Sequence, residues 1–190
     1  MRLVAIGGSA GAIDALRLVL HPIPADVRAG FVVVVHIPAT TPSLLAEVIA
    51  THSALPVREA FDKQPLEPGV VVVAPPDYHL LVERELTLAL SRDAPVRFSR
   101  PSIDPMFESV ADAAGPRAIG ILLTGANQDG AAGLAAIQAA GGLVAVQDPT
   151  TARATEMPMA GIAAVAPDLV GDPAALGRWL ATLLAVREPA

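Results

Sequence analysis

Short, almost continuous apolar runs alternate along this chain with segments whose apolar residues recur at helical spacing. The run FVVVVH at 31–36 has the length and β-branched content of a strand buried on both faces of a parallel sheet. Glycine and proline mark the borders of such segments, as where Pro22 ends the first helical pattern. The runs that predict strands are 2–6, 31–36, 56–60, 118–123 and 143–147.

The helical segments carry end signals as well as periodicity. Ser43 stands where a helix N-cap is expected, and Gly141 and Gly142 follow a helical segment as C-terminal glycines do. The predicted helices cover 12–20, 43–52, 101–114, 131–140, 159–164 and 173–186.

The stretch 70–90 departs from this alternation. Its runs VVVAPP, YHLLVE and LTLAL are short and separated by turn residues, which predicts strands and at least one hairpin. Elsewhere the alternation favours a parallel sheet with helices on both faces and right-handed crossovers. We therefore expect an α/β fold with a single domain over residues 1–190. Its core would be a mostly parallel, doubly wound sheet of about seven strands, with a small antiparallel hairpin.

Composition narrows the function classes. The 190 residues suit one domain, and the absence of cysteine excludes disulfides, cysteine nucleophiles and thiolate metal sites. A net charge of −6 without a basic block argues against nucleic acid as a partner. The longest apolar runs fall far short of the roughly 20 residues that span a bilayer, and the N-terminus lacks a signal-peptide pattern. We expect a cytoplasmic protein without membrane insertion.

The turn Gly7-Gly8-Ser9-Ala10-Gly11 follows the first predicted strand and precedes a helix. It fits the G-x-S-x-G pattern, in which a sharp turn exposes the serine and the helix N-terminus offers N–H groups to an oxyanion. The same glycines also resemble a degraded dinucleotide-binding turn, which would bind phosphate or only pack. Ser9 is therefore a candidate nucleophile with two competing interpretations.

A serine nucleophile needs a base, and His36 is the best placed of the four histidines. It ends the second predicted strand, and adjacent parallel strands bring their carboxyl ends together, where sites form in open α/β sheets. A strand-end histidine held by its loop is the alternative. His79 is expected in a loop that could line the site, while His21 and His52 are expected at the surface.

The base in turn needs an orienting carboxylate. Asp129 follows a third predicted strand and its glycine-containing loop, directly before a helix. An N-cap is a common role for such an aspartate, and the two roles are compatible. Ser9, His36 and Asp129 are thus expected at one edge of one sheet, in a chain order that differs from that of α/β-hydrolases.

These motifs resemble the catalytic domain of the chemotaxis protein-glutamate methylesterases, the CheB family. The resemblance runs from Val4 to about Leu169, with the motifs in family order. It implies that Ser9, His36 and Asp129 are the catalytic serine, histidine and aspartate. The segments that carry it are Ala5-Ile6-Gly7-Gly8-Ser9-Ala10-Gly11, Val35-His36-Ile37-Pro38, Arg100-Pro101-Ser102-Ile103-Asp104 with Phe107-Glu108-Ser109-Val110-Ala111, and Leu123-Thr124-Gly125-Ala126-Asn127-Gln128-Asp129-Gly130-Ala131.

The resemblance implies hydrolysis of glutamyl methyl esters on methyl-accepting chemoreceptors, with release of methanol, and often deamidation of receptor glutamines. Ser9 would attack the ester after His36 takes its proton, while Asp129 holds the imidazole. No metal or organic cofactor is needed.

Substrate contacts beyond the triad are also implied. Backbone N–H groups near the serine turn and in the loop 124–129 would stabilise the oxyanion; the residues concerned are Ala10, Gly125 and Ala126. The candidates for contact with an acidic surface of the receptor's cytoplasmic helices are His79, Arg97 and Arg100. For the arginines, solvated loop charge is an equally good interpretation.

Three departures from the family pattern keep other functions open. The family usually has threonine at Ala10, glutamine at Val35 and methionine at Ala126. One alternative is a serine esterase or amidase with a target outside chemotaxis, and another is a binding or scaffold protein that has lost turnover. Met1 begins almost on the first catalytic strand, so we expect no receiver domain here, and a separate response-regulator domain or a longer parent chain.

Overall fold

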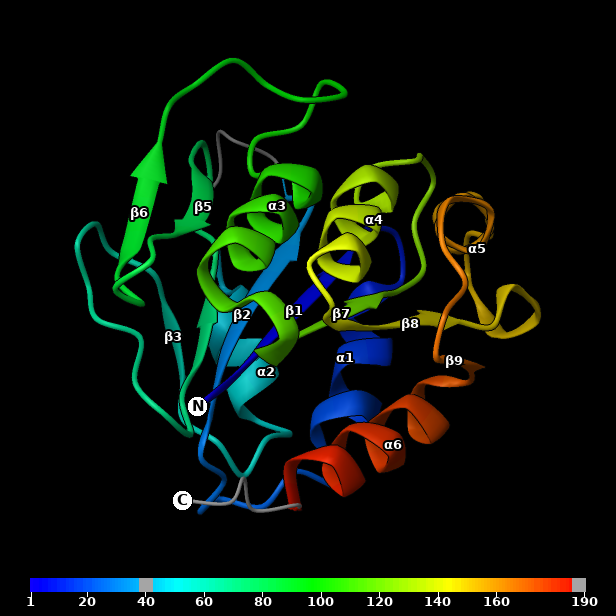
Figure 1. Cartoon of the computed structure of the whole chain (residues 1–190), viewed down its shortest axis with the longest axis horizontal. Coiled ribbons are helices and arrows are strands. Elements are labelled where there is room, and N and C mark those ends of the chain that lie inside the picture. Colours follow the sequence, from blue (N-terminus) through cyan, green and yellow to red (C-terminus); the bar gives the residue numbers. More distant parts are fainter. Residues whose placement is uncertain (38–42, 186–190) are drawn as a thin grey trace.

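The computed structural model describes residues 1–37 and 43–185. Pro38, part of one family-like segment, and Val186, the predicted end of the last helix, lie outside the described residues. Strands and helices alternate along most of the chain, as the sequence predicts, but between residues 57 and 91 four strands follow one another without a helix (Figure 1).

Seven strands form one sheet in which every neighbouring pair is parallel. The order across the sheet is β3-β4-β2-β1-β7-β8-β9, so β1 lies at its centre. This confirms the predicted fold class. The strands are β1 (Arg2–Gly8), β2 (Ala29–Val35), β3 (Val57–Glu59), β4 (Val71–Val73), β7 (Ala118–Leu122), β8 (Leu143–Gln147) and β9 (Leu169–Gly171).

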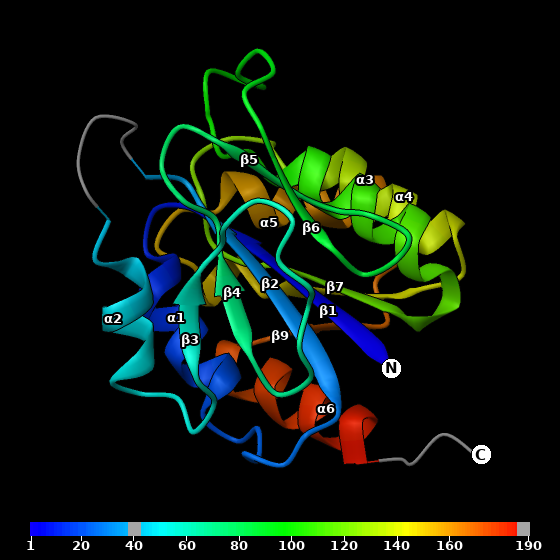
Figure 2. The same cartoon turned by 90° about the vertical axis from the view of Figure 1, so that its left-hand side faces the viewer.

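Helices cover both faces of the sheet (Figure 2). One face packs on α1 (Ala12–Leu20), α2 (Leu45–Ala50) and α6 (Pro173–Ala185). The other packs on α3 (Ile103–Ala114), α4 (Ala131–Ala139) and α5 (Glu156–Ala164), together with the antiparallel hairpin β5 (His79–Val82) and β6 (Leu88–Ser91). Short 3-10 turns lie at Gly115–Arg117 and Pro149–Thr151.

The β2 sequence explains why the sheet is central. Successive side chains of a strand point to opposite faces, and in β2 both sets are apolar and buried. Val32 and Val34 pack in the core on the α3 side, whereas Phe31 and Val33 pack in the core on the α1 side. A strand of this kind is stable only between two layers of helices.

The strand order creates a switch point at the centre of the sheet. From β1 the chain passes through α1 to β2 on one side, and from β7 it passes through α4 to β8 on the other. Because α1 and α4 cover opposite faces, the chain leaves the carboxyl ends of β1 and β7 in opposite directions. Ligands bind at such points in open α/β sheets.

Four local predictions need correction. Strand β9 was not predicted. Helix α5 begins before Pro158, because a proline is tolerated in the first turn of a helix. Ser43 is not the N-cap of α2: that position is Leu44, and the Ser43 hydroxyl accepts the Leu45 N–H at 3.1 Å. Helix α2 also ends at Ala50, before His52.

Candidate active site at the carboxyl edge of the sheet

Ser9 lies directly after β1, held by the ladder of the sheet. Its N–H donates to the Thr124 carbonyl at 2.9 Å, and its own carbonyl accepts the Ala12 N–H at 3.0 Å as the chain turns into α1. The serine is half-buried and Ala10 is exposed. The turn therefore presents Ser9 at the carboxyl edge, as predicted.

Close packing explains the glycines of this turn. Gly11 has φ +83°, a left-handed conformation that glycine adopts without steric cost. A Cβ at Gly8 would lie 2.6 Å from the Ala12 Cβ, and one at Gly11 would lie 2.7 Å from the Arg153 Cβ. Larger residues at either position would push the serine turn out of place.

His36 follows β2 by one residue, on the strand adjacent to β1. The last register pair is Gly8 with Val35, and the His36 N–H continues the ladder to the Gly8 carbonyl at 3.2 Å. Ser9 and His36 are thus the next residues on two neighbouring parallel strands, which lie about 4.8 Å apart. The sheet itself brings the candidate base beside the candidate nucleophile.

Asp129 forms a short hydrogen bond with His36. The Nε2 of His36 lies 2.7 Å from Oδ2 of Asp129, and the Asp129 side chain is fully buried. A carboxylate accepts only, so Nε2 is the donor in this bond, and in the neutral imidazole Nδ1 then keeps its lone pair. This is the arrangement of a base oriented by a carboxylate.

Asp129 also caps the N-terminus of α3. Its Oδ2 accepts the Ile103 N–H at 2.7 Å and its Oδ1 accepts the Asp104 N–H at 3.0 Å. Burial by itself raises the pKa of Asp129, but the hydrogen bonds from His36 and the two backbone N–H groups outweigh it and hold that pKa below its ordinary value. The carboxylate is therefore kept ionised beside the imidazole.

Asp104 makes the reciprocal cap. Its Oδ1 accepts the Gly133 N–H at 2.8 Å, within the first turn of α4. Burial raises the pKa of Asp104 and the nearby charge of Asp129 raises it further, against the opposing effect of the Gly133 N–H. Asp129, expected to cap the helix that follows it, instead caps α3, while α4 takes its cap from Asp104.

Thr124 joins the serine turn to the segment before α5. Its hydroxyl accepts the Ala154 N–H at 2.9 Å and lies 2.9 Å from the Ala10 carbonyl, to which it can donate. Its backbone N–H donates to the Gln147 side chain at 2.9 Å. Thr124 is 1% exposed, so the hydrogen bonds that hold the turn around Ser9 in place are made by a buried polar side chain.

The backbone N–H groups near Ser9 differ in availability. Those of Ser9 and Gly125 are used, the second by the Ala154 carbonyl at 3.1 Å. Those of Ala10 and Ala126 have no acceptor in the described part of the chain, and both residues are exposed. The N–H that follows a nucleophile is the usual oxyanion donor, which favours Ala10. Ala126 is a better candidate than Gly125 because its N–H is free of acceptors in the described part of the chain.

The three side chains predicted to contact an acidic receptor surface lie in or beside the segment between β5 and α3. His79 lies in β5 rather than in a loop and is 2% exposed; it bonds to the Ala94 carbonyl and the Ser102 N–H. Arg100 bonds to Asp77. The polar groups of both side chains are used in hydrogen bonds within the domain, so the structure gives no support to their predicted contact with substrate. Arg97 is more exposed, with its Nε 3.9 Å from Oδ2 of Asp104.

Arg153 borders the serine turn, which the sequence did not indicate. It is exposed, and its side chain lies against Gly11. No ion pair joins Arg153 to an acidic side chain among the described residues. Its position far along the chain hides this proximity from any local motif.

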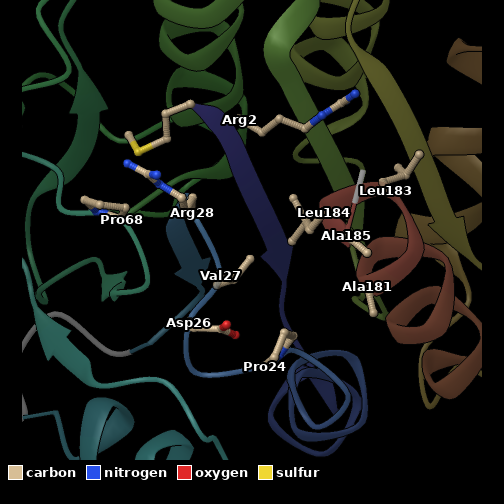
Figure 3. Close-up of a pocket in the computed structure, with 11 residues that line it drawn as sticks. Arg2, Pro24, Asp26, Val27, Arg28, Pro68, Ala181, Leu183, Leu184 and Ala185 are labelled. Carbon is tan, nitrogen blue, oxygen red and sulfur yellow. The ribbon is translucent and has the colours of Figure 1, made fainter. Parts of the chain in front are cut away.

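A cavity of about 640 Å³ lies at the opposite, amino edge of the sheet (Figure 3). Its walls include Leu183 and Leu184 of α6 and the segment before β2. The side chains of Arg2 and Arg28 point away from one another there (Figure 3). The cavity holds no histidine or serine among its described lining residues, so it lacks a nucleophile and base of the kind found at the carboxyl edge.

Two classes of site are missing from the described ranges 1–37 and 43–185. No three His, Asp or Glu side chains gather there as a metal ion would require. None of the helices in these ranges has the length and apolar character needed to cross a bilayer.

Comparison with known proteins agrees with the geometry. The family model described as CheB methylesterase matches residues 4–180. The CheB methylesterase catalytic domain of Thermotoga maritima superposes with a TM-score of 0.91 at 29% identity, over 96% of this chain and 98% of that one.

The match to sequence relatives spans different shares of those proteins. A Leptospira interrogans relative is 41% identical over 167 residues, which are 88% of this chain and 86% of the relative. Proteins named protein-glutamate methylesterase/protein-glutamine glutaminase come from Anaeromyxobacter dehalogenans (42% identical, 94% of this chain) and Maricaulis maris (38% identical, 82% of this chain). The match spans only 54% and 40% of these two proteins.

The doubly wound sheet, with a serine turn and a histidine–aspartate pair at its switch point, defines an α/β enzyme of the hydrolase class. Within that class, the chain belongs to the CheB methylesterase family.

Proposed function

We propose that the chain hydrolyses glutamyl methyl esters on the cytoplasmic helices of methyl-accepting chemoreceptors, releasing methanol, and deamidates receptor glutamines by the same route. The observation that carries the proposal is the 2.7 Å bond between His36 and the buried Asp129, one strand away from Ser9. The names of the Anaeromyxobacter and Maricaulis relatives support the glutamyl substrate.

The chemistry follows from the orientation of the histidine. With Nε2–H donated to Asp129, Nδ1 of His36 accepts the proton of Ser9 as Oγ bonds to the ester carbonyl carbon. The bond to the methoxy oxygen then breaks, and methanol leaves with the proton from His36. Water, activated by the same histidine, cleaves the acyl-serine to give a glutamate carboxylate and free Ser9. An amide substrate releases ammonia instead.

Negative charge develops on the carbonyl oxygen during both steps. The N–H groups of Ala10 and Ala126 are without acceptors in the described part of the chain and lie at the same edge as Ser9. We propose them as the oxyanion donors; removing one such donor typically costs about 100- to 1,000-fold in turnover.

Arg153 suits a substrate that carries acidic side chains next to the ester. It is exposed and lies against the nucleophile turn without an acidic partner among the described residues. A glutamyl substrate whose neighbouring glutamates are already free would present carboxylates there. We propose that Arg153 binds them.

The remaining expectations on context are proposals too. The curated Anaeromyxobacter and Maricaulis relatives carry about as much chain again outside the match, or more. We propose that residues 1–190 act as one catalytic domain in the cytoplasm, alongside a response-regulator domain.

Methanol release from a methylated receptor fragment tests the proposal. The wild-type chain should release methanol, and Ser9→Ala should reduce the release to background. Hydrolysis of small esters without methanol release from receptors would favour an esterase with another target. Neither activity, in a folded chain, would favour the scaffold interpretation.

A further inference from the structure

The segment between β6 and α3 rises above the rest of the described chain in both views (Figures 1 and 2). Its tip is a two-residue hairpin turn. The Val96 N–H donates to the Ser99 carbonyl at 3.1 Å, and the Ser99 N–H donates back to the Val96 carbonyl at 2.9 Å. Arg97 and Phe98 occupy the two central positions.

The residues at this tip do not suit the backbone that they adopt. Arg97 has φ +48° and Phe98 has φ +64°, both in the left-handed region. A tight hairpin turn with two positive φ values strongly prefers Asn-Gly, because bulky side chains are strained there. Strain that persists in a loop points to a use for the side chains.

Phe98 is the most exposed large apolar side chain among the described residues. Its relative exposure is 103%, whereas Phe31 and Phe107 are fully buried. An aromatic ring contributes most to binding when it leaves water for an apolar pocket on a partner. Here the ring is held in water at the end of a projecting turn.

Hydrogen bonds at the base of this loop hold the turn at its tip in one conformation. The Ser102 hydroxyl bonds to the carbonyls of Val96 and Ser99. Arg100 donates to Asp77 at 3.0 Å and to two carbonyls of the loop. A turn ordered in advance loses little entropy when it binds.

The tip is also continuous with the catalytic edge. Nε of Arg97 lies 3.9 Å from Oδ2 of Asp104, and the Asp104 N–H bonds to Asp129. Two residues therefore separate Phe98 from the carboxylate that orients His36. A polypeptide bound over Ser9 has this turn at one flank.

We propose that the Val96–Ser99 turn is a docking point for the polypeptide substrate, in which Phe98 inserts among apolar side chains of the substrate helix. This proposal rests on the proposed function for the nature of the substrate. A small ester lacks the helix among whose side chains Phe98 would insert, so the contribution of the turn is confined to polypeptide substrates.

Kinetics with two substrates test the docking point. For Phe98→Ala, kcat/KM on a methylated receptor cytoplasmic fragment should fall about tenfold or more, mainly through KM, the size of a hot-spot truncation. On p-nitrophenyl acetate it should change less than about twofold. The variant Phe98→Gly keeps Arg97 beside Asp104 and relieves the positive φ at position 98, and it should show the same split. Leu18→Ala removes a half-exposed apolar side chain from the outer side of α1 and serves as the matched control.

Binding separates this proposal from the proposed function. In a Ser9→Ala background, Phe98→Ala should weaken calorimetric binding of the methylated fragment by the same factor. If the wild type releases methanol but Phe98→Ala behaves like Leu18→Ala in both assays, the docking point is wrong and the function stands. If no methanol is released but binding still depends on Phe98, the function is wrong and the docking point stands. A concentration-dependent dimer lost in Phe98→Ala, with substrate binding unchanged, would assign the turn to self-association and overturn the proposal.

Discussion

The two edges of the sheet differ in what they are built from. The amino edge has a cavity of about 640 Å³, lined mostly by apolar side chains, together with Asp26 and two arginines that point apart. The carboxyl edge has two buried carboxyl groups. Asp129 accepts a hydrogen bond from the N-terminus of α3, and Asp104 accepts one from the N-terminus of α4. Buried carboxylates cost free energy unless they are paired, so their presence here favours the carboxyl edge as the active site. A concave surface alone does not locate an active site.

The largest effect should come from breaking the pair at the carboxyl edge. Asp129→Asn replaces the acceptor of His36 Nε2–H with an amide and should lower kcat about 1,000- to 10,000-fold, because the imidazole is no longer held in its working tautomer. Stopped-flow or steady-state turnover of a small ester measures this. Circular dichroism on the same sample checks folding; a folded variant within tenfold of wild type would break the account.

Thr124→Val tests the buried polar support beneath Ser9. Valine has nearly the same shape but leaves the Ala154 N–H without its acceptor. We expect a loss of about 1–3 kcal/mol in the free energy of unfolding, the usual cost of an unpaired buried donor. Urea denaturation gives the value. Thr182→Val, at an exposed hydroxyl of α6, should stay within about 0.5 kcal/mol, and equal losses for both would contradict the assigned role.

Acid titration should separate the two carboxylates. The pKa of Asp129 is lowered on folding, so its stabilising contribution is present above about pH 3.9 and is lost as pH falls through the lower folded value. The pKa of Asp104 is raised, so its ionisation opposes folding as pH rises from about 3.9 through the folded value. Asp104→Asn should therefore gain stability relative to wild type as pH rises over that interval. Denaturant midpoints measured across this range would show it, and a constant difference would contradict the raised pKa.

Arg153→Glu should have a smaller and substrate-dependent effect. Reversing this charge beside the nucleophile turn should lower kcat/KM several-fold on receptor fragments with free glutamates near the ester, and the loss should shrink at high salt. A fragment with those glutamates changed to glutamine is the control substrate. If the loss in kcat/KM is the same on both substrates and at every salt concentration, Arg153 supports the turn only by packing.

The smallest effect belongs to the amino edge. Arg28→Ala changes an exposed residue at the cavity and should leave turnover within about twofold and stability within about 0.5 kcal/mol. A loss of activity comparable to that of the carboxyl-edge variants would make the two edges equivalent and contradict the comparison.

The sheet and the order of its elements could be predicted because buried parallel strands leave long apolar runs, as in β2. The position of the serine turn could be predicted for the same reason, since it follows directly from β1. Strand β9 could not, because three residues at a partly exposed edge leave no such run. The placement of the whole chain in a known family followed from ordered motifs and is confirmed by the comparisons.

The parts of the site that escaped prediction depend on long-range packing. No local pattern tells that Asp129 caps α3 rather than its own helix, because the two lie together only in the folded sheet. His79 looks like a loop residue between turn signals, yet it is buried in β5. Arg153 meets Gly11 only through the connection that follows β8.

Labelling with a fluorophosphonate tests the central claim most directly, because it requires a serine that is activated and not only exposed. Mass spectrometry of the labelled, proteolysed chain should find one adduct on Ser9, absent in Ser9→Ala and formed far more slowly in His36→Gln. An adduct on another residue, or undiminished ester hydrolysis by Ser9→Ala, would contradict the account.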